Sequence, residues 1–162
     1  MKFRFIACYL LMVLSPAVYS LDSSVEEYHE LSIGIGSNTS ALAVETGYVV
    51  ENILPAIDLT YGFGFSYLSH PDPYFGSSFS IGLPLSVGML FSVSSISVKP
   101  YVRAQYDLFQ SSLGYDVGAY YTRDTETLGI MLMQRSYSVD SLFGGSTTKG
   151  VTLIGISYGM MW

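Results

Sequence analysis

Eight charged residues occupy regular positions in stretches that alternate between large apolar and small polar residues. They are Glu30, Glu45, Asp58, Lys99, Arg103, Asp107, Asp116 and Arg135. Within each stretch the charge shares its parity with glycine and serine, and the other parity holds the large apolar residues. Carboxylates can neutralise guanidinium and ammonium groups, and a buried ion is tolerable only when it is paired. The pattern therefore predicts an interior polar network, which would be either a paired plug or an ion path gated through exchangeable pairs.

The elements that must position these charges are β-strands, because the alternation has a period of two residues. It is clearest in residues 57–67, 79–91 and 96–108. Weaker versions occupy residues 31–35, 42–50, 113–121, 128–132 and 154–162. Single-chain bacterial membrane barrels have an even number of strands, and an Arg or Lys facing the middle of the bilayer costs about 2–4 kcal/mol. Since the apolar parity is uncharged, we expect it to face lipid, and the fold to be all-β: an eight-stranded antiparallel up-and-down transmembrane β-barrel.

A soluble β-sandwich would also alternate, so the position of glycine matters. Most of the 16 glycines lie on the polar parity. The interior of an eight-stranded barrel is only wide enough for packed side chains, which favours small residues there. Pro84 and Pro100 interrupt two of the predicted strands. Proline in a sheet is normally confined to edges and bulges, so we expect bulges at both positions.

The even strand number places both chain ends on one side, which we take as the periplasm. Residues 69–74 and 140–149 then form the longest outer loops, and residues 92–95 form a tight periplasmic turn. The eight charges divide into three levels. We expect Glu30, Asp58 and Lys99 near the periplasm, Glu45 and Arg103 at mid-height, and Asp107, Asp116 and Arg135 toward the outside.

The N-terminus has the pattern of an export signal. A basic start, Met-Lys-Phe-Arg, precedes an apolar run over residues 5–14 and small residues around Ser20. The run is too short for a membrane helix, which needs about 20 residues. We therefore expect a signal peptide over residues 1–20 and an outer-membrane β-barrel over residues 21–162.

Removal of the signal would leave a chain without cysteine, because Cys8 lies inside it. The rest of the chain keeps all 13 acidic residues. Its bases are Lys99, Arg103, Arg123, Arg135 and Lys149. Such an acidic chain is a poor partner for nucleic acid, which requires a basic surface. We identify no metal-binding cluster, cofactor motif or phosphate-binding loop, and we expect a monomer.

The C-terminal strand ends on an aromatic residue. Ile154, Ile156, Tyr158, Met160 and Trp162 share one parity. This ending resembles the C-terminal insertion signal of bacterial outer-membrane proteins, which the barrel-insertion machinery reads. Over residues 21–162 the chain resembles the small eight-stranded barrels of the OmpA transmembrane domain and OmpX class. The resemblance implies the outer membrane of a Gram-negative bacterium, with membrane lipid and lipopolysaccharide as neighbours.

Three functions remain open at this point. The first is a non-enzymatic barrel with a role in envelope structure or surface contact through its outer loops. The second is a lipid A-modifying acyltransferase or deacylase. His70 with Asp140 and Ser141 is a loose analogue of the acyltransferase arrangement. A deacylase resembling known examples would need a serine two residues after a histidine, and neither His29 nor His70 is followed by one. The third is a narrow passive pore. The expectation is that the chain has no catalytic residues.

Overall fold

The computed structural model describes residues 24–72, 74–92, 97–140 and 146–161. The predicted signal peptide and Trp162 lie outside these ranges. The described residues form nine strands: β1 Val25–Gly36, β2 Thr39–Leu54, β3 Ile57–Asp72, β4 Gly76–Gly82, β5 Pro84–Phe91, β6 Val98–Asp107, β7 Ser112–Arg123, β8 Glu126–Asp140 and β9 Ser146–Met161. Over the same residues, no helix is long and apolar enough to cross a membrane.

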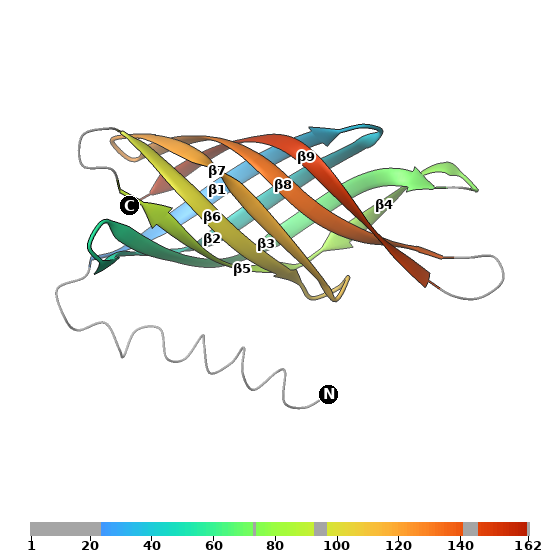
Figure 1. Cartoon of the computed structure of the whole chain (residues 1–162), viewed down its shortest axis with the longest axis horizontal. Helices are drawn as coiled ribbons and strands as arrows, with labels where there is room; N and C mark the ends of the chain where they lie inside the picture. Colours follow the sequence, from blue (N-terminus) through green and yellow to red (C-terminus); the bar gives the residue numbers. More distant parts are fainter. Residues whose placement is uncertain (1–23, 73, 93–96, 141–145, 162) are drawn as a thin grey trace, which may run out of the picture.

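The strands form one closed antiparallel barrel (Figure 1). Strands that follow one another in the chain pair, except β4 with β5, and β9 pairs with β1 to complete the ring. β4 and β5 both pair with β3 in a single register, so they are two parts of one long strand that is interrupted at Leu83. The barrel therefore has eight strands, as the alternation predicted.

Alternation divides the residues between the two faces of the barrel wall. The outward parity carries exposed apolar side chains, such as Ile130, which is 68% exposed. The inward parity carries the charges: Arg103 and Asp116 are 5% and 0% exposed. The apolar parity thus faces away from the interior, which excludes the soluble sandwich, where the same residues would form the core.

The prediction of bulges at the two prolines is wrong. Pro84 starts β5, and the register between β3 and the β4–β5 strand is the same on both sides of it. The pairing is interrupted only there, where the proline has no N–H to donate. β6 pairs with β5 only from Tyr101 onward, and Pro100 lies one residue before Tyr101. Pro100 therefore interrupts no ladder bond to β5. The register shift lies in β2 instead, between Val50 and Leu54.

The β3–β4 and β8–β9 hairpins extend beyond the rest of the wall at one rim of the barrel, which we call the far rim (Figure 1). The first and last described residues, Ser24 and Met161, lie at the opposite rim, which we call the side of the chain ends. β4 pairs only with β3, and β9 pairs with β1 only from Ile154 onward. Strand structure therefore continues through Asp72 and Asp140 and resumes at Ser146, where the sequence predicted longer loops. The connection between β1 and β2, by contrast, is only Ser37 and Asn38. The predicted turn at residues 92–95 falls largely outside the described residues.

Candidate functional site inside the barrel

Two pairs of inward charges face each other across the barrel. Glu30 on β1 lies opposite Glu45 on β2 in the register, and Arg103 on β6 lies opposite Asp116 on β7. Like charges on directly paired positions destabilise a sheet. A cation that reaches the two glutamates from the β6 side of the barrel offsets this repulsion.

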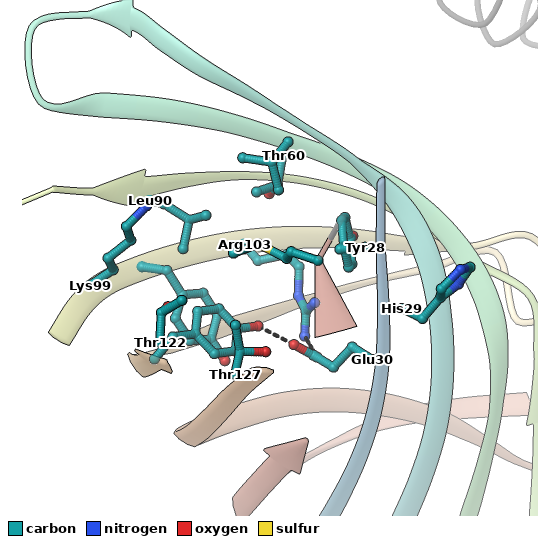
Figure 2. A pocket seen from close by; sticks show the side chains of 13 residues that line it. Tyr28, His29, Glu30, Thr60, Leu90, Lys99, Arg103, Thr122 and Thr127 are labelled. Atoms are coloured by element: carbon teal, nitrogen blue, oxygen red, sulfur yellow. Dashed lines mark hydrogen bonds and ion pairs between the residues drawn. The ribbon is translucent and has the colours of Figure 1, made fainter. Parts of the chain in front are cut away.

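That cation is Arg103, whose guanidinium contacts three carboxylates. Its Nη2 donates to Glu30 Oε1 at 2.9 Å, and its Nη1 donates to Glu45 Oε1 at 3.3 Å. Nε and Nη2 both donate to Asp116 Oδ2, at 3.1 and 3.0 Å. The rigid fork of guanidinium donors suits this geometry, which a lysine could not reproduce. Figure 2 shows Arg103 and Glu30 pointing toward one another, joined by a dashed contact.

Arg135 extends this group toward the far rim. Its Nη1 donates to Asp116 Oδ1 at 2.6 Å, so both oxygens of Asp116 bind a guanidinium. We call Glu30, Glu45, Arg103, Asp116 and Arg135 the central cluster. It contains three carboxylates and two guanidinium groups, and neutral donors complete the remaining coordination.

Those neutral donors come from residues that the sequence did not single out. The hydroxyl of Tyr28 donates to Glu45, and that of Tyr120 donates to Glu30. Ser86 Oγ donates to Glu45 Oε1 at 2.6 Å, and Gln105 Nε2 donates to Asp116 Oδ2 at 3.1 Å. All four share the parity of the charges, which was the available signal. Tyr101 completes the surroundings, because its ring stacks on that of Tyr120 with centroids 4.2 Å apart.

Two of the predicted residues form a separate pair near the chain ends. Lys99 Nζ lies 3.3 Å from Asp58 Oδ2. The backbone N–H of Asn52 donates to Asp58 Oδ1 at 2.9 Å, and Ser92 Oγ donates to its Oδ2 at 3.3 Å. Asp58 is buried while Lys99 is partly exposed. The pair thus links the β2–β3 side of the mouth to β6.

Asp107 has a different role from the one predicted. Its Oδ1 accepts the backbone N–H groups of Phe109 and Gln110, both at 2.9 Å. This is the geometry of an aspartate that stabilises the turn following it. The levels predicted for two other residues also change: Glu30 and Asp116 both join Arg103 in the central cluster.

Two small hollows flank the central cluster. One opens toward the chain ends and is lined by Lys99, Tyr101 and Thr122, and the other lies toward the far rim beside Gln105 and Arg135; each measures about 40 Å³. A water site needs about 10–15 Å³ by this measure, so each hollow has room for about three water molecules. Thr122 Oγ1 and Arg135 Nη2 are buried without a protein hydrogen bond among the described residues, and water in these hollows would satisfy them.

The far mouth is crossed by a contact between the two tall hairpins. His70 on β3 is 3% exposed, and its ring stacks on that of Tyr137 on β8 with centroids 4.1 Å apart. His70 Nε2 also lies 3.1 Å from Ser80 Oγ on β4. β3 and β8 lie far apart around the ring, so this stack spans the mouth.

The remaining predicted positions carry no comparable cluster. Ile154, Ile156 and Tyr158 point outward from β9, and Met160 pairs with His29 and Glu126. The partners suggested for His70 are not described, since the Asp140 side chain and all of Ser141 lie outside the described residues. Within the described residues, no three His, Cys, Asp or Glu side chains are placed to hold a metal ion.

Comparisons with known proteins give little beyond overall shape. No protein-family model matches the chain, and no curated protein is significantly similar to it. Among solved structures, the chain is similar to a major outer membrane protein from Thermus thermophilus. The match has 15% sequence identity and a TM-score of 0.44, and it covers 86% of this chain and 100% of the other. At this level of similarity, nothing about the function of this chain follows from it.

Proposed function

We propose that this chain is an integral outer-membrane β-barrel without enzymatic activity, which contributes to envelope structure or to surface contact. The exposed apolar parity is the observation that carries the proposal. Large apolar side chains such as Phe63, Phe65 and Ile154 are more than half exposed, and comparable side chains recur around the barrel wall. Soluble monomers rarely expose contiguous apolar patches beyond a few hundred Å². A bilayer is the solvent in which such a wall is stable, with membrane lipid and lipopolysaccharide as its partners.

The interior favours a structural barrel over a pore. Arg103 binds carboxylates from β1, β2 and β7, and therefore ties opposite sides of the wall together. The hollows on either side of the central cluster hold only a few water molecules each. An ion would have to displace several charged contacts to pass. We expect purified protein in planar bilayers to show no stable conductance, and discrete channel openings would contradict a closed interior.

The far rim offers the surface for contact with the environment. At the tip of the β3–β4 hairpin, Asp72 Oδ1 accepts the backbone N–H groups of Tyr74 and Phe75, both at 2.8 Å. This fixes the turn that presents Phe75, which is 86% exposed. A large exposed aromatic side chain on an ordered turn suits binding to another molecule.

The enzymatic alternative has less support. His70 is stacked on Tyr137 and buried, so its imidazole is not presented to a lipid substrate. Mass spectrometry of lipid A from cells with and without the protein tests this alternative directly. A change in acyl chain number would favour the lipid A-modifying enzyme over the structural barrel.

Electrophoresis of the folded protein in detergent tests the membrane proposal itself. A membrane barrel keeps its fold in mild detergent, so unboiled and boiled samples should migrate differently. Insertion should also require the barrel-insertion machinery of a Gram-negative host, measured by depletion of that machinery. Release of the protein from cells without detergent, together with identical migration of both samples, would refute the proposal.

A further inference from the structure

A groove on the outside of the wall is far larger than the hollows inside it. It measures about 500 Å³, within the size range of pockets that hold small molecules. Its floor includes Leu31 on β1 and Val44 on β2. Phe63 and Phe65 on β3 stand along one side, and Tyr158 on β9 stands along the other. The groove therefore runs along the wall between two aromatic edges and is almost entirely apolar.

One end of the groove, toward the chain ends, is polar. His29 and Thr46 are register partners on β1 and β2, and both line the groove there. His29 Nε2 lies 3.7 Å from Glu27 Oε1, and both side chains are about half exposed. On the Tyr158 side, the tyrosine hydroxyl donates to Glu126 Oε1 at 3.1 Å. Glu126 is the register partner of Arg123 on β7, so a cation opposes its charge there. The charged groups at this end of the groove are thus the Glu27 carboxylate and the His29 imidazole.

We propose that the groove binds an acyl chain of a zwitterionic, amine-bearing glycerophospholipid, whose headgroup lies at His29 and Glu27. The inference rests on the proposed membrane location, which places the groove in the leaflet nearest the chain ends. An apolar channel of this volume accommodates a lipid chain, and binding there buries both the chain and the exposed edges of Phe63 and Phe65.

Charge decides the class of headgroup. The ammonium group of the lipid is attracted by Glu27, whereas a net-anionic headgroup is repelled by it. The lipid phosphate can accept hydrogen bonds from the Thr46 hydroxyl and the His29 ring, which lie nearer the groove. A headgroup that carries both charges therefore matches this end better than one that carries only the phosphate.

Native mass spectrometry of the intact barrel tests the groove. The protein is released from micelles after incubation with phosphatidylethanolamine or with phosphatidylglycerol. We expect one retained phosphatidylethanolamine per barrel and at least threefold lower occupancy by phosphatidylglycerol. Val44→Phe fills the floor and should lower occupancy at least threefold. Val117→Phe is the matched control, because Val117 on β7 is 48% exposed against 54% for Val44 and lies outside the groove.

A second pair of variants tests the headgroup. Glu27→Gln should reduce the preference for phosphatidylethanolamine at least twofold, and Asp124→Asn, which removes a charge from the β7–β8 turn of the same rim, should leave it unchanged. Equal lipid occupancy in wild type, Val44→Phe and Val117→Phe would overturn the proposal that the groove binds an acyl chain. Loss of headgroup preference in both charge variants, or in neither, would overturn the role of Glu27. The heat-dependent gel shift of the same samples tests separately whether the protein is a folded membrane barrel. A protein that shows the gel shift but retains no lipid would therefore contradict the lipid site and leave the proposed function standing.

Discussion

Replacing Arg103 with methionine removes the cation that holds the central cluster together. Methionine has a similar length and no charge, so the substitution tests the ion contacts more than the packing. Asp116 would keep Arg135 and Gln105 as partners. Glu30 would keep only the Tyr120 hydroxyl among the contacts described. Glu45, which lies beside Glu30 in the register, would keep the Tyr28 and Ser86 hydroxyls but no cation. The loss of charge neutralisation therefore falls on these two glutamates.

The size of the effect follows from burial. Glu30 and Glu45 are 6% and 4% exposed, so the few water molecules that the hollows hold cannot replace the hydration of two free carboxylates. Breaking a buried ion pair by removing one partner costs about 3–5 kcal/mol. We expect the free energy of unfolding of Arg103→Met to fall by about that amount. Adding Glu30→Gln and Glu45→Gln to Arg103→Met should recover most of the loss, because neutral amides do not need the cation.

The assay is equilibrium urea unfolding of the protein inserted in lipid vesicles, followed by the heat-dependent gel shift. Lys99→Met is the matched control, since the one contact that Lys99 makes among the described residues, with Asp58, is partly exposed and Asp58 keeps the Asn52 and Ser92 donors. It should cost less than about 2 kcal/mol. A stability of Arg103→Met within about 1 kcal/mol of wild type, or no recovery in the triple variant, would refute the view that Arg103 neutralises these glutamates.

Three further predictions concern the wall, the interior and the far rim. Ile130→Arg on the outward face should lower stability in vesicles by about 2–4 kcal/mol, whereas Ser138→Arg, higher on β8, should cost at most about 1 kcal/mol; equal costs in urea unfolding would contradict a lipid-facing belt. Gly47→Ala should destabilise by about 1–3 kcal/mol, because its Cβ would lie 2.2 Å from the Tyr61 carbonyl oxygen, while Gly150→Ala meets only the flexible Gln134 amide and should be tolerated in the same assay. The backbone N–H groups of Phe75 and Tyr74 lower the pKa of Asp72, so the turn should be stabilised at neutral pH and lose that support as the pH falls below the usual range of an aspartate. NMR line widths of the Tyr74 and Phe75 amides, followed from pH 7 to about pH 2, would show this. Asp72→Ala should already behave at pH 7 as wild type does at the low end of that range.

The sequence by itself determined the class of fold and the two faces of its wall. Period-two alternation predicts strands, and an apolar parity that is free of charge within the predicted stretches, beside a glycine-rich polar parity, is consistent with a narrow barrel whose apolar side faces outward. It also identified which charges point inward, since parity is a local property of each strand. The prediction of bulges at the two prolines was wrong because a strand can lack one ladder hydrogen bond and still keep its register. Whether a proline removes a ladder bond also depends on where the neighbouring strand ends, which the sequence of one strand does not show.

Only the tertiary structure decided which of the inward charges meet. Closure of the ring brings β6 within reach of β1 and β2, and the stagger of the strands sets the height of each residue. Arg103 therefore binds Glu30 and Glu45, which are more than fifty residues away in the chain, while Asp107 on the same strand stabilises a turn. The donors Tyr28, Tyr120 and Ser86, the stack of His70 on Tyr137 and the groove across β9, β1, β2 and β3 depend on the same closure. Parity is fixed by the backbone of one strand, but contact across a lumen depends on the positions of all eight.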